Sequence, residues 1–199
     1  MHSSAMSLFQ EWDTRLFYWV FEGLRADWLT PLMLLLSEGN KWWSVRIGML
    51  LLWLFLVWRG GRARLFALLI IPTLMVTNEC CDLLKEWVGR VRPCVALPIE
   101  PLTGRLTSPS FPSAHAANMA ALVGLAGVLG SWRVALALIG LPLLVGLARI
   151  YVGVHYPSDV VGGWVIGWAI GAGVGWLWRW IAARRTSKPS VSESDTRGT

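Results

Sequence analysis

Long apolar runs alternate with short polar stretches along most of this chain. Each run is long enough, or nearly long enough, to cross a hydrocarbon core of about 30 Å as an α-helix. A segment inside a bilayer must satisfy its own backbone hydrogen bonds, so these runs predict helices. The five predicted spanning helices are residues 42–58, 65–84, 116–129, 133–148 and 160–181.

A sixth apolar segment, residues 16–36, is interrupted by charged residues. Glu22, Arg25 and Asp27 stand inside it, and charged side chains are costly at the centre of a bilayer. The segment is therefore either a sixth span or an amphipathic stretch in the membrane interface that leads into a short apolar turn. The sequence predicts an all-α, polytopic membrane bundle of five to six transmembrane helices.

Composition agrees with a single membrane domain. Hydrophobic residues make up 55% of the chain and charged residues only 15%, where soluble proteins have about 25% charged residues. We expect this domain to cover residues 1–185. Residues 186–199 are rich in Ser and Thr, contain no apolar run, and are predicted to be a disordered cytoplasmic tail.

The net charge of +6 is explained by membrane topology and not by a nucleic-acid partner. Arg59, Arg62 and Arg64 lie in one loop, Arg133 lies in another, and a basic cluster at 179–188 follows the last helix. With five spans these three places fall on the same side. Basic loops tend to remain in the cytoplasm, so the other end of the bundle is expected to face outward.

Three polar motifs stand out against the apolar helices, and all are predicted on the outward side. They are Lys85 followed by Arg92-Pro93, then the run 112–115 (Pro-Ser-Ala-His), then Arg149 followed by His155 and Asp159. Together they supply three cations, two histidines and a carboxylate. Such a set can hold a phosphate, attack it and protonate the group that leaves.

Ser113 and His115 stand where a helix begins. Pro112 disfavours helix before it, Ser113 is a good N-cap residue, and an apolar run follows. The free N–H groups of a helix N-terminus can bind phosphate oxygens. Ser113 is either an ordinary cap or a phosphate ligand, and the polar ring of His115 in the first turn favours the second interpretation.

His155 and Asp159 flank another helix start. A carboxylate four residues on can reach back to the imidazole, fix its tautomer and make the free nitrogen a better nucleophile. The alternative is a local cap without chemistry. Any one of Lys85, Arg92 and Arg149 could likewise be a headgroup anchor, but their occurrence with two histidines favours an anion site.

These motifs resemble those of a known family. Lys85-x6-Arg92-Pro93, Pro112-Ser113-Ala114-His115 and Arg149-x5-His155-x3-Asp159 are similar in order and spacing to the three motifs of the type 2 phosphatidic acid phosphatase (PAP2) family. Its members are membrane lipid phosphatases related to vanadium haloperoxidases. Two departures are Ala114, where many members have Gly or Asp, and Ala148, where many have Ser, which removes one possible phosphate hydroxyl.

The resemblance implies a role for each motif residue. His155 would form a phosphohistidine, Asp159 would support it, and His115 would protonate the leaving oxygen and then activate water. The implied phosphate-binding residues are Lys85, Arg92, Ser113 and Arg149. The resemblance implies no metal and no cofactor.

Other polar residues are candidates for support. Asp82, one turn before Lys85, is either a clamp on that lysine or simply solvated at a helix end, and Asn118 follows His115 by one turn. The proline-rich loop 94–111 is an ordered cover or a mobile lid. Glycines recur every fourth residue in the last helix and predict close packing in the bundle, or less favourably a seam between two copies: Gly163, Gly167, Gly171 and Gly175.

We therefore expect a multi-pass enzyme of a bacterial-type inner (plasma) membrane whose active site faces the periplasm or exterior. Its expected reaction is hydrolysis of a lipid phosphate or diphosphate, first undecaprenyl diphosphate, because the run 155–160 is similar to that of family members acting on it. Phosphatidylglycerophosphate, phosphatidic acid and lipid A phosphates are alternative substrates. An anionic-lipid transporter or binding protein is the non-enzymatic alternative, and a soluble haloperoxidase is disfavoured because these helices are apolar nearly all round.

Overall fold

The computed structural model describes residues 2–186, and all regular secondary structure in that range is helical. Within that range there is no β-strand, which confirms the all-α prediction. Residues 187–199 of the predicted tail lie outside the described residues. The elements are α1 (His2–Phe21), α2 (Thr30–Glu38), η1 (Gly39–Lys41), α3 (Trp43–Arg59), α4 (Gly61–Val88), α5 (Pro93–Ala96), α6 (Ala114–Leu129), α7 (Trp132–Leu138), α8 (Gly140–Tyr151) and α9 (Pro157–Thr186).

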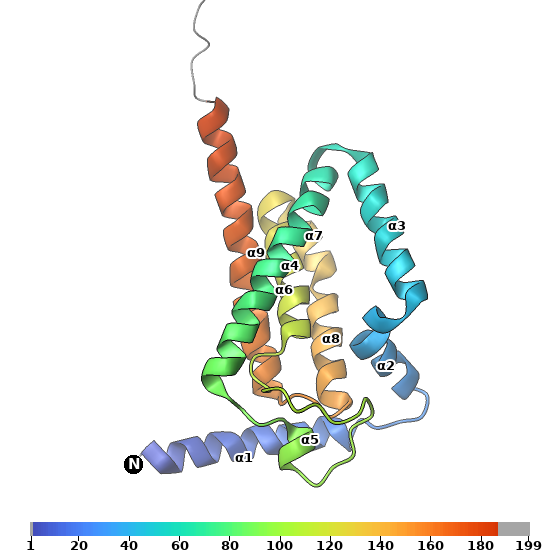
Figure 1. Ribbon diagram of the computed structural model, residues 1–199, viewed down its shortest axis with the longest axis vertical. Coiled ribbons are helices and arrows are strands. Elements are labelled where there is room, and N and C mark those ends of the chain that lie inside the picture. The colour runs from blue at the N-terminus through green and yellow to red at the C-terminus, as the bar shows by residue number, and fades with distance from the viewer. Residues whose placement is uncertain (1, 187–199) are drawn as a thin grey trace, which may run out of the picture.

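The central helix of the bundle is α6, which packs most extensively along α9 and also contacts α4 and α8 (Figure 1). Its small residues Ala117 and Ala121 are completely buried. They face Gly167 and Gly171 of α9, where an added Cβ would overlap the carbonyls of those two alanines. Small side chains on both helices thus permit the close backbone approach predicted from the glycine repeat.

All five predicted spanning segments form helices, but they differ in length. Three stretches are long and apolar enough to cross a membrane, namely Gly61–Ala96, Trp132–Tyr151 and Pro157–Arg185. The stretches Thr30–Lys41 and Trp43–Arg59 would make a fourth span as a pair bent by 69°. The remaining apolar helix, Ala114–Leu129, is shorter and lies inside the bundle.

The possible sixth span over residues 16–36 is wrong. Helix α1 ends at Phe21 and α2 begins only at Thr30, so the three charged residues fall in the turn between them. Helix α1 lies across the end of the bundle (Figure 1). It exposes Trp12 and Trp19 and buries Phe17 on its other face, which fits the interfacial alternative.

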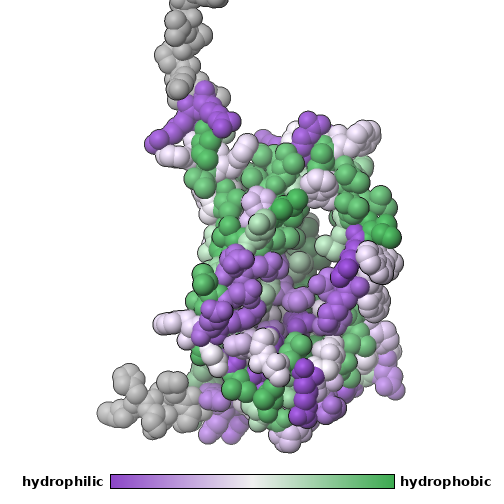
Figure 2. Space-filling model, in the orientation of Figure 1, coloured by the Kyte–Doolittle hydropathy of each residue, from purple (hydrophilic) through white to green (hydrophobic). Residues whose placement is uncertain are grey.

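The two ends of the bundle differ in character. The Arg59–Arg64 turn and the last residues of α9 lie at one end, whereas α1, α5 and the loop 97–113 lie at the other (Figure 1). On the face shown in Figure 2, hydrophobic residues cover much of the upper half, and hydrophilic residues gather over the lower half. All three polar motifs lie toward that lower end.

Candidate active site

The starts of α6 and α9 and the end of α8 bring the polar motifs together. Ser113 is the N-cap of α6, Arg149 lies in the last turn of α8, and Asp159 lies in the first turn of α9. Arg92 precedes α5, and His155 lies in the short connection between α8 and α9. The structure therefore places residues from distant parts of the sequence in one cluster.

His155 is held between a cation and a carboxylate, and only 2% of it is exposed. Its Nε2 lies 3.0 Å from Arg92 Nη1, and its Nδ1 lies 3.6 Å from Asp159 Oδ2. A guanidinium can only donate hydrogen bonds, so Nε2 must be the acceptor. The neutral ring then carries its proton on Nδ1, which faces Asp159, and Nε2 keeps the lone pair that a nucleophile needs.

Asp159 is fully buried, and its carboxylate is fixed by groups other than His155. Arg90 Nη1 donates to Oδ1 at 2.6 Å, the Tyr156 N–H donates to Oδ2 at 2.8 Å, and the Ser110 hydroxyl donates to the same oxygen. Three donors favour the ionised carboxylate. Its position opposite His155 Nδ1 is thus set before any substrate binds.

Arg92 connects the imidazole to the loop that covers the site. Its guanidinium donates to the carbonyl of Val154 at 2.9 Å, to the carbonyl of Ser108 at 2.7 Å and to the carbonyl of Pro109 at 3.2 Å. The loop is bound again where the Leu102 N–H donates to a carbonyl at the end of α8. In this structure the loop is therefore tied both to Arg92 and to the end of α8.

Arg149 is anchored by helix α2, a partner that the sequence did not indicate. Its Nη1 donates to Ser37 Oγ at 2.7 Å and to Glu38 Oε1 at 2.9 Å, while its buried Nε has no hydrogen-bond partner among the described residues. A carboxylate at the end of an apolar helix needs a cationic partner. This was the one signal in the sequence that could have identified Glu38 as a partner of a site arginine.

Ser113 does not make the ordinary cap. Its side chain accepts no hydrogen bond from α6, and its buried hydroxyl has no partner within residues 2–186. The backbone N–H of Ser113 donates to the carbonyl of Asp159 at 3.0 Å, which joins the starts of α6 and α9. The hydroxyl is therefore available to a ligand at this helix terminus, and half-buried His115 follows in the first turn.

Lys85 and the two support candidates lie on the α4 side of the site. Lys85 Nζ pairs with Asp82 Oδ1 at 2.7 Å, and the Asp82 carboxylate is 64% exposed. Asn118 Nδ2 donates to Asn78 Oδ1 at 2.9 Å and thereby links α6 to α4. The predicted clamp contact is present, but the roles of these residues in binding phosphate stay predictions.

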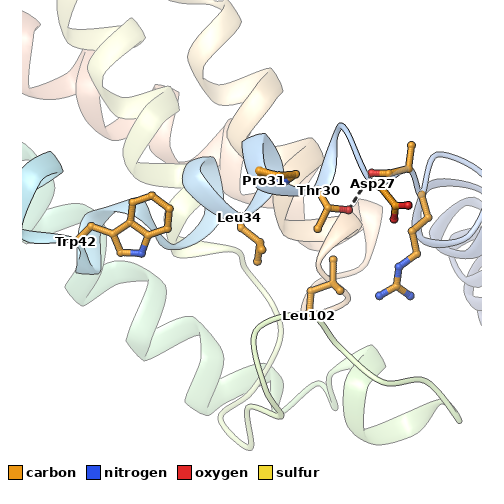
Figure 3. A pocket seen from close by; sticks show the side chains of 8 residues that line it. Asp27, Thr30, Pro31, Leu34, Trp42 and Leu102 are labelled. Atoms are coloured by element: carbon orange, nitrogen blue, oxygen red, sulfur yellow. Dashed lines mark hydrogen bonds between the residues drawn. The ribbon is translucent and has the colours of Figure 1, made fainter.

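A separate pocket of about 540 Å³ opens beside the cover loop. Figure 3 shows Thr30, Pro31 and Leu34 of α2 on one side of it and Leu102 of the loop on the other. No residue of the three motifs lines this pocket. It is therefore separate from the His155 cluster.

The described part of the chain contains no evident metal-binding cluster. No group of three or more His, Cys, Asp or Glu side chains there is close enough to hold a metal ion. The chemistry that these side chains offer is nucleophilic attack by an imidazole beside fixed cations.

We expect His155 to stay neutral well into the acid range. Burial lowers the pKa of His155 from 6.5 to about 3, and the neighbouring arginines act in the same direction, against Asp159. Because the charged form is disfavoured, the ring should take up a proton only at a pH far below the usual value. Nitrogen NMR of histidine-labelled protein, with His155→Gln to assign the signal, measures this. Protonation near pH 6.5 would contradict the expectation.

Comparison with known proteins identifies the family. The model of the PAP2 superfamily matches residues 63–186. Phosphatidylglycerophosphatase B of Bacillus subtilis is 31% identical over 152 residues, which cover 71% of this chain and 64% of that protein. Lipid A 1-phosphatase of Rhizobium etli is 28% identical over 150 residues, which cover 67% of this chain and 64% of that protein. The chain thus matches about two thirds of the length of each.

Solved structures show the same fold. The transmembrane PAP2-type phosphatidylglycerolphosphate phosphatase of Bacillus subtilis superposes with a TM-score of 0.69 at 23% identity and covers 87% of this chain and 88% of that one. LpxE of Aquifex aeolicus gives a TM-score of 0.66 at 22% identity and covers 81% and 93% of the two chains. Together with the family match over more than half of the sequence, this shows that the chain is a membrane protein of the PAP2 superfamily.

Proposed function

We propose that the protein hydrolyses a lipid phosphate or diphosphate ester through a phosphohistidine, without a metal ion. The observation that supports this most strongly is the environment of His155. Its Nε2 lone pair faces Arg92, and its Nδ1 faces a carboxylate that is already held by three donors. This is the arrangement of a nucleophile with its orienting group, placed next to a donor for a phosphoryl oxygen.

The proposed reaction has two steps. His155 Nε2 attacks phosphorus, the bond from phosphorus to the leaving oxygen breaks, and His115 gives that oxygen a proton. Water, deprotonated by His115, then attacks the phosphohistidine, the P–N bond breaks and inorganic phosphate leaves. Arg92, Arg149, Lys85 and the Ser113 hydroxyl would hold the phosphoryl oxygens while their negative charge grows.

For the substrate we favour undecaprenyl diphosphate. The run 155–160 supports it, as does a relative named undecaprenyl-diphosphatase BcrC from Bacillus subtilis, which is 36% identical over 80 residues, 40% of this chain and 41% of that protein. Phosphatidylglycerophosphate, phosphatidic acid and lipid A phosphates remain the alternatives. The motif residues would bind the phosphoryl group, which all of these lipids share, and not the lipid part.

Phosphate release from a panel of these lipids tests the proposal. Purified protein in detergent with EDTA should release inorganic phosphate, and the preferred lipid should give the highest kcat/KM. Transport or binding without hydrolysis would leave every lipid intact and would support the non-enzymatic alternative. Activity that depends on added metal would contradict the proposed chemistry.

We propose further that the site opens to the outer face of a bacterial-type inner membrane. The basic Arg59–Arg64 turn and the C-terminal end of α9 lie at the opposite end of the bundle from the site (Figure 1). The tendency of basic segments to remain in the cytoplasm supports this orientation.

Two introduced cysteines test the orientation. Natural Cys94 is buried and its thiol faces the carbonyl of Leu106, so the reporter belongs at Arg105, whose side chain is 58% exposed in the cover loop. An impermeant thiol reagent on intact spheroplasts should label Arg105→Cys, and should label Arg62→Cys only after lysis. Protein with its natural cysteines gives the background. The reverse pattern would place the site in the cytoplasm and exclude action on a lipid at the outer face.

A further inference from the structure

Asp13 is a buried carboxylate on the inner face of the interfacial helix α1. Only 4% of it is exposed, whereas its neighbour Trp12 is 62% exposed. Burial of an unpaired charge is costly, so Asp13 requires a partner. That partner is Arg90, whose Nη2 donates to Asp13 Oδ2 at 2.6 Å.

Arg90 joins this carboxylate to the one opposite His155. Its second nitrogen, Nη1, donates at 2.6 Å to Asp159 Oδ1. The guanidinium also lies over the ring of Tyr156, with 4.2 Å from its central carbon to the ring centroid. A planar fork that bridges two carboxylates and stacks on an aromatic face has little freedom to move, and a lysine cannot reproduce that geometry.

Asp13 also binds the start of α9 directly. Its Oδ1 accepts the backbone N–H of Ser158 at 2.9 Å, and its Oδ2 accepts the Ser158 hydroxyl. The first turn of a helix has free N–H groups and a positive dipole end, so a carboxylate is favourable there. Helix α1 therefore supplies, from a distant part of the sequence, an acceptor for a free N–H group of this first turn.

We propose that Arg90 and Asp13 are positioning residues that hold Asp159 against His155, with Asp13 acting through Arg90. The inference rests on the proposed function. Neither residue belongs to the set that would touch phosphate, so loss of either should affect how well the nucleophile is oriented and leave substrate binding largely intact. The interfacial helix would thus be a working part of the active site.

Kinetics of matched variants test this. Arg90→Gln should lower kcat about tenfold to a hundredfold, the scale on which loss of a partner of a site residue acts, with little change in KM. Asp13→Asn should have the same kind of effect and a smaller one, and Arg90→Lys should recover only part of kcat. The controls are Glu11→Gln on the exposed face of α1 and Arg105→Gln in the cover loop, both with unchanged kcat.

Coupling between the two residues distinguishes positioning from general instability. If Asp13 acts mainly through Arg90, the double variant should have a kcat close to that of Arg90→Gln and well above the product of the two single effects, because only the direct contacts of Asp13 with Ser158 are left to lose. Independent effects that multiply would contradict the relay. A rise in KM at unchanged kcat would also contradict it, since it would show a role in substrate binding.

A measurement without turnover separates this inference from the proposed function. In histidine-labelled protein, the Nδ1–H signal of His155 should move in Arg90→Gln and in Asp13→Asn, and should stay in place in Glu11→Gln. Wild-type protein that releases no phosphate would contradict the proposed function alone. An unmoved signal in both variants would overturn the positioning inference, whether or not the protein is a phosphatase.

Discussion

Replacing His155 by alanine is expected to abolish phosphate release and the acid-labile phosphoenzyme together. In the structure Nε2 of this ring carries the lone pair, which accepts from Arg92, and Asp159 faces the opposite nitrogen, so alanine removes both the nucleophile and the group that Asp159 orients. Rapid acid quench with a radiolabelled lipid phosphate measures the intermediate, and phosphate release measures turnover.

Removal of His115 should give a different defect. As the proposed proton donor to the leaving oxygen, it contributes about 10² to 10⁴ in rate, and the loss should shrink when the leaving group is good. With such a substrate His115→Ala should form the phosphoenzyme and hydrolyse it slowly, so the intermediate accumulates. His2→Ala, which changes the chain's third histidine, is the control. A normal phosphoenzyme in His155→Ala would refute the assignment of the nucleophile.

Periodicity predicts the helices, and spacing predicts that His155 and Asp159 lie together, because both are local properties. Apolar runs must be helical in a bilayer, and a helix start next to His155 brings Asp159 back toward it. The division of residues 16–36 was harder to predict. Its apolar residues suit a span, but Phe17 and Phe21 of α1 pack in the core and Asp13 binds Arg90 and Ser158, so that α1 lies across the end of the bundle (Figure 1).

The partners of the motif residues could not be predicted from spacing. Arg90 lies two residues before Arg92, yet Arg90 points to Asp13 and Asp159 while Arg92 points to His155. The partner of Arg90 on α1 is distant in sequence, and so are the partners of Arg92 in the cover loop and beside His155. The same holds for Glu38 on Arg149, a contact between residues 111 positions apart.

Arg92→Ala and Arg149→Ala are each expected to lower kcat/KM by about 10² or more, the cost of losing one donor to a developing oxyanion. Arg149→Lys should retain only part of kcat/KM, because an ammonium point charge replaces the planar guanidinium with its paired donors. Arg105→Ala, in the exposed part of the cover loop, is the control. Unchanged kinetics would show that these arginines only anchor lipid headgroups.

Arg149→Ala alone has a second consequence, because it removes the buried cation from the Glu38 carboxylate, which is 14% exposed, and leaves only the exposed Lys41 as its partner. A largely buried carboxylate that keeps only an exposed cation is poorly compensated, so the single variant should also unfold at a lower temperature. Adding Glu38→Gln removes that charge. If Arg149 binds the phosphoryl group, the double variant should regain thermal stability and stay about 10² slower than wild type. Recovery of activity together with stability would instead mean that Arg149 serves only to neutralise Glu38.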